Sequence, residues 1–166
     1  MTNKLFTTLA ITATIVPLAL GGMAPEAKAE VGGAALQEAV RRTGTTWDTG
    51  WCDESGVDGY FSYYVGTMEE AHIQICTNGN PTASEQWETF RHEAIHLAQK
   101  CENRLHGDTF ETLTTWSFLK SQASESDAEF ITRAYPQEKW GIELEAFTFM
   151  RQSNQTIANV VNRACN

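Results

Sequence analysis

The stretch RHEAIHLAQ, residues 91–99, places two histidines four positions apart, with a glutamate directly after the first. It lies within residues 84–101, which are predicted to form one helix. Side chains four residues apart lie one above the other on a helix, so His92 and His96 project toward a common point that can hold a metal ion. Glu93 is one step round the helix, beside that point, where it can accept a proton from a coordinated water. The pattern therefore predicts two ligands and a general base.

The helical context supports this interpretation. Ser84 is the expected N-cap, and Glu85 and Glu88 lie in the first turn, where negative charge is favourable. Apolar residues recur at helical spacing at Trp87, Phe90, Ala94, Leu97 and Ala98. The competing interpretation is an ordinary helix in which two histidines are four apart by chance, because a short motif alone has a false-positive risk.

A catalytic zinc site requires a third protein ligand. Glu143 and Glu145 are candidates, because they lie in an otherwise apolar helix where a buried carboxylate is unfavourable unless it is paired or binds a cation. They are two residues apart and so lie on different faces, and one of them is expected to point to solvent. His106 is a weaker candidate, since the chain would have to double back to bring it to the metal. The residues alone leave Glu143 and Glu145 open.

The HExxH motif, followed by Glu-x-Glu-Ala on a second helix, resembles the gluzincin group of zinc metallopeptidases over about residues 71–150. The resemblance implies a zincin-like fold and one Zn²⁺ per chain, bound by His92, His96 and Glu143, with Glu93 as the general base. Glu145 remains the alternative third ligand, since it matches a different branch of the group.

The chain departs from the pattern of these relatives in one respect. Many of them have Asp or Asn four residues after the carboxylate ligand, where it orients a ligand histidine. This chain has Phe147 or Phe149 there, depending on the register. Either another acid, such as Glu145, Asp108 or Asp127, takes that role, or the site is weaker than the motif suggests.

The activity that the resemblance implies is hydrolysis of peptide bonds in a peptide or protein substrate by a zinc-dependent metalloendopeptidase. Tyr135, at a helix entrance before Glu143, is the candidate that stabilises the oxyanion, and Arg133 is a weaker one. The alternative is a secreted protein that keeps zinc for stability and has no proteolytic activity. Glu93 discriminates between them, because a protein that keeps only the metal does not need a base.

Residues 1–29 have the features of a secretory signal peptide. Lys4 provides a positive start, residues 5–20 are mainly apolar, and Ala27-Lys28-Ala29 matches a cleavage site. The apolar run is too short to be a strong membrane span. We expect the mature protein, residues 30–166, to be a single domain that is secreted or held in the periplasm or cell envelope.

Charge and cysteine content agree with export. The chain of 166 residues has a net charge of −9, and this acidity disfavours nucleic acid as a partner. Its four cysteines lie outside the predicted signal peptide, and they are too far apart for a cysteine zinc site. Three disulfide pairings are possible, of which we favour Cys52 with Cys76 and Cys101 with Cys165.

The fold class expected is α+β, with a small antiparallel β-sheet followed by a mainly helical, disulfide-bonded, zincin-like domain. Alternating or β-branched segments predict the sheet, and the strand at residues 71–76, directly before the motif helix, is expected to be an edge along which a peptide can lie. The expected helices outside the motif comprise residues 30–43, 109–121, 124–134 and 137–165.

Overall fold

The computed structural model describes residues 6–7, 32–53, 56–64, 70–102 and 112–166. Apart from β1 (Phe6–Thr7), the predicted signal peptide lies outside these residues. The other elements are α2 (Gly33–Arg42), β2 (Thr46–Gly50), β3 (Gly59–Tyr64), β4 (His72–Cys76), α3 (Ala83–Glu102), α4 (Trp116–Gln122), α5 (Glu125–Ala134), the 3-10 helix η1 (Gln137–Lys139), α6 (Trp140–Phe149) and α7 (Asn154–Cys165). A small sheet precedes a mainly helical remainder, so the expected α+β class is confirmed.

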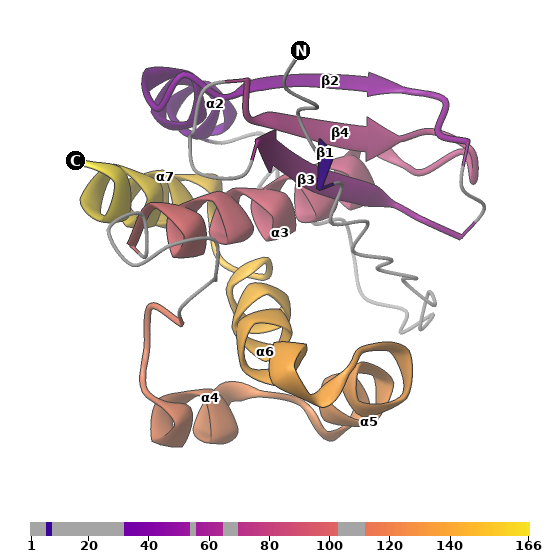
Figure 1. Ribbon diagram of the computed structural model, residues 1–166, viewed down its shortest axis with the longest axis vertical. Helices are drawn as coiled ribbons and strands as arrows, with labels where there is room; N and C mark the ends of the chain where they lie inside the picture. Colours follow the sequence, from indigo (N-terminus) through magenta and orange to yellow (C-terminus); the bar gives the residue numbers. More distant parts are fainter. Residues whose placement is uncertain (1–5, 8–31, 54–55, 65–69, 103–111) are drawn as a thin grey trace, which may run out of the picture.

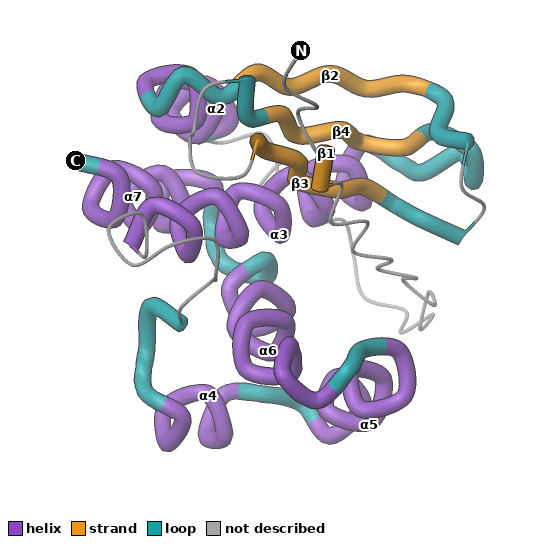
Figure 2. The backbone as a smooth tube through the Cα atoms, in the orientation of Figure 1, coloured by secondary structure: helices purple, strands orange, loops and turns teal. Residues whose placement is uncertain are grey.

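The elements lie in three tiers (Figure 1). The sheet forms one tier, α3 and α7 pack beneath it, and α4, α5 and α6 form the third tier on the other side of α3. The same view coloured by secondary structure places the described strands together in the first tier (Figure 2). The motif helix α3 is thus the central element, in contact with the sheet on one side and with α6 on the other.

The sheet is mixed rather than antiparallel. Its strand order is β1-β3-β4-β2, and β4 pairs antiparallel with β3 but parallel with β2. The expected antiparallel sheet was wrong, because alternation of apolar residues identifies the buried face of a strand but not the direction of its neighbours. The strand before the motif helix, β4, is also an interior strand and not the expected edge.

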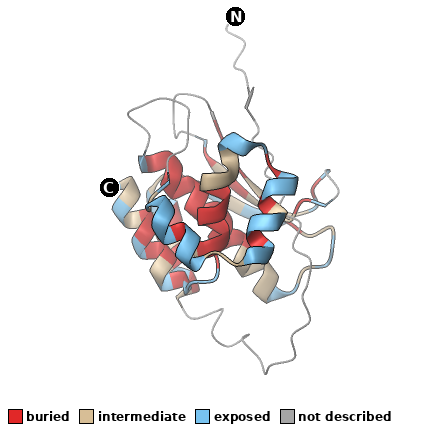
Figure 3. Ribbon diagram, turned by 90° about the horizontal axis from the view of Figure 1, so that it is seen from below, coloured by how far each residue is buried: buried red, intermediate tan, exposed pale blue. Residues whose placement is uncertain are grey.

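Helix α6 is enclosed by two hydrophobic clusters. The larger lies among the sheet, α2, α3 and α7 and includes Ala146, and the smaller joins α4, α5 and α6 and includes Leu144 and Phe147. Glu143 and Glu145 are consequently both buried, and the expectation that one points to solvent was wrong because both faces of α6 are covered. Buried residues gather in the middle of the molecule, with exposed ones on its outer helices (Figure 3).

The motif helix begins at Ala83 and ends at Glu102, close to the predicted bounds. Its cap is Thr82 rather than the expected Ser84. The Thr82 hydroxyl accepts a hydrogen bond from the Glu85 N–H, and the Glu85 carboxylate accepts one from the Thr82 N–H. This reciprocal capping box satisfies two backbone donors at the start of α3.

Helix α4 is shorter than the helix expected over residues 109–121. Residues 109–111 lie outside the described residues, and α4 begins only at Trp116. Thr115 is its N-cap, with a hydroxyl that accepts from the Phe118 N–H. Residues 113 and 114, just before Thr115, form a bend in which both N–H groups bind a buried carboxylate, described below.

The long helix expected over residues 137–165 is divided into η1, α6 and α7. Ser153 caps α7 by accepting a hydrogen bond from the Thr156 N–H, and the buried Arg91 guanidinium donates to Met150 O where α6 ends. A side-chain cap and a long-range bond therefore fix the break. No helix in the described part of the chain has the length and apolar character of a bilayer span.

Both disulfides have the favoured pairing. One joins Cys52, after β2, to Cys76 at the end of β4, and the other joins Cys101 to Cys165. The second bond fastens the end of the motif helix to the end of α7. Covalent links therefore hold both the sheet and the central helix pair.

Candidate metal centre

Two imidazoles meet above one turn of α3. The Nε2 atoms of His92 and His96 are 3.1 Å apart, and their rings are inclined by 79°. The two residues are 1% and 0% exposed. They face inward because α6 packs on the same side of α3, and the His92 ring contacts the Phe147 ring edge to face.

Helix α6 brings a carboxylate to the same point. Glu143 Oε2 lies 3.6 Å from the Nε2 atom of each histidine. Glu143 is completely buried, and neither of its oxygens has a partner at hydrogen-bond distance among the described residues. A buried carboxylate without a donor is unfavourable unless a positive charge is near. His92, His96 and Glu143 form a potential ligand group in which all ligand atoms lie within 4.8 Å of one another.

The spacing of these atoms fits a tetrahedral ion. Bonds of about 2.0–2.1 Å at tetrahedral angles place two ligand atoms about 3.3 Å apart. The separations in this group are 3.1 and 3.6 Å. Two imidazoles and one carboxylate are also a donor set that proteins use for divalent metals such as zinc. The residues present therefore fit a metal ion with three protein ligands.

The tautomer of His96 is set by Gln99. The Gln99 amide nitrogen donates to Ile142 O at 3.0 Å and to Glu145 Oε2 at 2.8 Å. Gln99 Oε1 is therefore the atom that faces His96 Nδ1, at 2.8 Å, and His96 must carry a proton on Nδ1. In neutral His96 the lone pair is then on Nε2, the atom that points at His92 and Glu143.

Glu145 lies outside the ligand group. Its oxygens accept hydrogen bonds from Gln99 Nε2, the Leu113 N–H, and both the N–H and the hydroxyl of Thr114, at 2.7 to 2.8 Å. Four donors satisfy this buried carboxylate without a cation. Glu145 instead orients a histidine, as the sequence suggested for one of three acids, and it does so through Gln99.

Glu93 lies beside the ligand group with a completely buried carboxylate. Neither of its oxygens has a hydrogen-bond partner at normal distance within the described residues. Burial raises the pKa of Glu93 to about 8, with the charge of Glu143 adding to the rise, while His96 and the Phe61 backbone oppose it. The pKa of Glu93 is thus close to neutral pH, as is favourable for a general base.

In the metal-free chain, the charges of the candidate ligands shift one another's pKa values. Burial favours a lower pKa for His96, but Glu143 and Glu93 raise it to about 9. Burial favours a higher pKa for Glu143, but the two histidines lower it to about 2. The pKa of His92 is lowered, mainly by burial. A protonated His96 therefore faces an ionised Glu143, and a bound metal ion would replace that proton.

Tyr135 is buried at the end of α5, directly before Pro136. Burial raises the pKa of its phenol far above the ordinary value, and the charges of Glu143 and Glu93 raise it further. Tyr135 is thus electrostatically coupled to both carboxylates and stays protonated, so that its hydroxyl can donate a hydrogen bond.

Other sequence candidates do not join this group. Arg133 is exposed on α5 and forms an ion pair within its own helix. Asp127 binds Arg151 and so connects α5 to the end of α6. His106 and Asp108 lie outside the described residues.

Sequence reasoning missed the role of Gln99. Gln99 stands where the longer motif HExxHxxGxxH has a glycine, a position that gives no indication of this role. The signal was its spacing: a residue three positions after His96 lies on the same helix face, and an amide there can hydrogen-bond the imidazole.

The chain matches no protein-family model, no curated protein and no solved structure. The resemblance to gluzincins therefore rests on the motif residues of the sequence alone.

Proposed function

We propose that the protein is an exported zinc-dependent metalloendopeptidase of the gluzincin type, with a zincin-like arrangement around α3. The observation that carries the proposal is the convergence of His92, His96 and Glu143 from two helices, with the Glu93 carboxylate beside them. These four residues are the ligands and the base that the resemblance implies.

Each of these residues then has a role in hydrolysis. Zinc held by His92, His96 and Glu143 would act as a Lewis acid and lower the pKa of a bound water. Glu93 accepts a proton from the water that attacks the peptide carbonyl carbon, and it passes that proton to the amine nitrogen as the C–N bond breaks. Tyr135 donates a hydrogen bond to the carbonyl oxygen as it becomes negative. Gln99 holds His96 in the required tautomer.

Export is part of the proposal. Residues 1–29 carry the signal-peptide features, and the two disulfides are stable in an oxidising compartment. We propose the periplasm, the cell envelope or the external medium as the site of action.

A second candidate function has an observation in its favour. His92, Glu93, His96 and Glu143 are at most 1% exposed, whereas a peptidase must admit a peptide to its metal. A secreted binding or structural protein stabilised by zinc requires no such access. However, a site that only stores a metal does not need Glu93, whose carboxylate is completely buried beside the ligand group without belonging to it. Glu93 therefore favours the peptidase.

The test combines zinc content with cleavage of a peptide library, with and without a chelator. We expect about one zinc per chain, and cleavage that the chelator abolishes. His96→Ala should lose both zinc and cleavage, whereas Glu93→Gln should keep zinc and lose cleavage. Glu129→Gln, on an exposed helix face, is the matched control and should behave as wild type.

Three results would change the conclusion. Equal cleavage by wild type and Glu93→Gln would exclude the proposed general base. Stoichiometric zinc without cleavage by wild type would favour the zinc-stabilised protein. Purified protein that neither contains nor takes up zinc would exclude both functions.

A further inference from the structure

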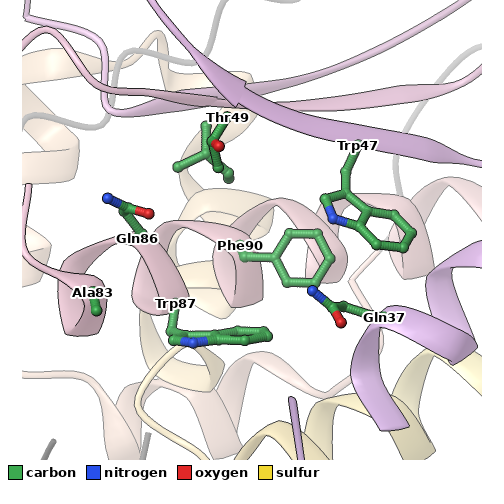
Figure 4. A pocket seen from close by; sticks show the side chains of 8 residues that line it. Gln37, Trp47, Thr49, Ala83, Gln86, Trp87 and Phe90 are labelled. Carbon is green, nitrogen blue, oxygen red and sulfur yellow. The ribbon is translucent and has the colours of Figure 1, made fainter. Parts of the chain in front are cut away.

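A cavity of about 180 Å³ lies among β2, α2 and the first half of α3 (Figure 4). Three aromatic rings line it: Trp47 hangs from β2, and Trp87 and Phe90 project from α3. The polar groups around it are Gln37, Gln86 and Thr49. This cavity is not part of the candidate metal centre.

The cavity and the metal centre use different faces of α3. At 3.6 residues per turn, Trp87 and Phe90 project about 140° and 160° away from His92 round the helix axis. His92 faces α6, whereas Trp87 and Phe90 face α2 and the sheet. A ligand in the cavity would therefore lie behind the helix that carries the histidines.

The lining selects an uncharged ring. Within the described residues, no charged side chain lines the cavity. The Phe90 ring is 5.8 Å from Trp47 and 5.7 Å from Trp87, with interplanar angles of 55° and 74°. Such inclined rings favour edge-to-face contact with another aromatic ring. Because an apolar cavity of about 150 Å³ can bind benzene, this cavity has the size of one aromatic side chain.

Among the described residues, the edge of β2 beside the cavity has no neighbouring strand. In the part of the chain that is described, β4 is the single neighbour of β2, and Thr46 and Gly50 use their backbone groups to bond toward that neighbour. Backbone groups alternate in direction along a strand, so those of Trp47 and Thr49 point to the open side. The side chains of the same two residues line the cavity. One strand therefore offers both backbone hydrogen bonds and a side-chain pocket.

We propose that this site binds an extended peptide segment as an added strand beside β2, with one uncharged aromatic side chain in the cavity. Every second side chain of the added strand would point toward α3, as strand addition requires. Trp51, just beyond β2 and 74% exposed, provides apolar surface for a further side chain of the segment. A small ring alone would fill the cavity and leave the strand edge without a partner, which is why a peptide fits the site best. The proposal does not depend on the metal centre.

The probes are threonine-rich hexapeptides, capped at both ends, that differ only in a central phenylalanine, serine or aspartate. The protein is the disulfide-bonded chain carrying Glu93→Gln, so that no probe is cleaved. Binding is measured from backbone amide chemical shifts. We expect the phenylalanine peptide to shift the Trp47 and Thr49 amides and to bind about ten- to a hundredfold more tightly than the serine peptide, from burial of one ring.

Two variants separate the strand edge from the cavity. Thr49→Pro removes a backbone donor on the open side, a change that edge strands tolerate, and it should reduce binding to the level of the serine peptide. Thr49→Val keeps the donor and is its control. Ala83→Leu extends a side chain into the cavity from the start of α3 and should also abolish discrimination. Ala34→Leu, at an exposed helix position, is the corresponding control.

The proposal would be overturned by either of two results. One is no shift with any peptide, or shifts that lie away from Trp47 and Thr49. The other is that free phenol binds the cavity while folded Thr49→Pro and Ala83→Leu bind the phenylalanine peptide as tightly as wild type. Circular dichroism and thermal melting establish that each variant is folded before it is compared.

Discussion

Gln99→Leu tests whether the hydrogen-bonded chain from His96 through Gln99 to Glu145 holds the metal centre in place. Leucine is similar in size to glutamine but can neither accept from His96 Nδ1 nor donate to Ile142 O and Glu145 Oε2. Glu145 keeps its donors from residues 113 and 114, so its carboxylate remains paired. The change therefore acts mainly on the orientation of His96.

The magnitude follows from what is lost. Removing a residue that orients a ligand histidine lowers metal affinity by about 10- to 100-fold, which is about 1.4–2.7 kcal/mol of binding free energy. The metal-free protein loses three buried hydrogen bonds, one of them to a carboxylate. Its free energy of unfolding should fall by about 2–4 kcal/mol.

Zinc affinity is measured near neutral pH by competition with a chromogenic chelator, and metal-free stability by urea unfolding with excess chelator. Gln155→Leu is the matched control, because Gln155 is exposed on α7 and bonds only Asn159 among the described residues. An affinity for zinc within about twofold of wild type in Gln99→Leu would refute the positioning role. A loss of stability with unchanged affinity would assign Gln99 a purely structural role.

Three further predictions concern stability. Without metal, the contribution of Glu93 to the free energy of unfolding falls as the pH rises from 4.5 to about 8, because the unfolded carboxyl ionises while the buried one stays protonated. Relative to wild type, Glu93→Gln should therefore gain about 1–3 kcal/mol at neutral pH and nothing near pH 4. Thermal melts that show no such gain would contradict this assignment. Replacing Cys101 and Cys165 by alanine should lower the free energy of unfolding, measured by urea titration, by about 4 kcal/mol, because the disulfide closes a loop with a sequence separation of 64. A loss below about 1 kcal/mol would show that the disulfide does not constrain the unfolded chain. Gly33→Ala places a methyl group 2.8 Å from the Trp87 ring. We therefore expect the free energy of unfolding to fall by about 1–3 kcal/mol and the phenylalanine peptide to bind more weakly. An unchanged melting temperature would show that the ring is not fixed there.

Local spacing was enough to predict the part of the site that lies on one helix. His92, Glu93 and His96 are fixed relative to one another by the helix itself, so their faces follow from sequence alone. The favoured disulfides were also correct, and the helix expected over residues 124–134 ends at Ala134, two residues before Pro136.

The sequence does not decide between Glu143 and Glu145 without the resemblance. Both are buried, because α6 has a hydrophobic cluster on either side. Which carboxylate meets the histidines depends on the rotation of α6 against α3, and Arg91 and the packing of Phe147 contribute to that orientation through contacts distant in sequence. The parallel pairing of β2 with β4 was missed for the same reason, since direction is a property of two strands.

The disulfide between Cys101 and Cys165 divides the candidate ligands. His92 and His96 precede the closed loop, and Glu143 lies within it. In a thiol-rich compartment this loop would open, and the carboxylate would depend on noncovalent packing alone to return to the imidazoles. We therefore expect the protein to bind a metal ion more tightly after oxidation than before, so that metal loading would follow disulfide formation and not synthesis.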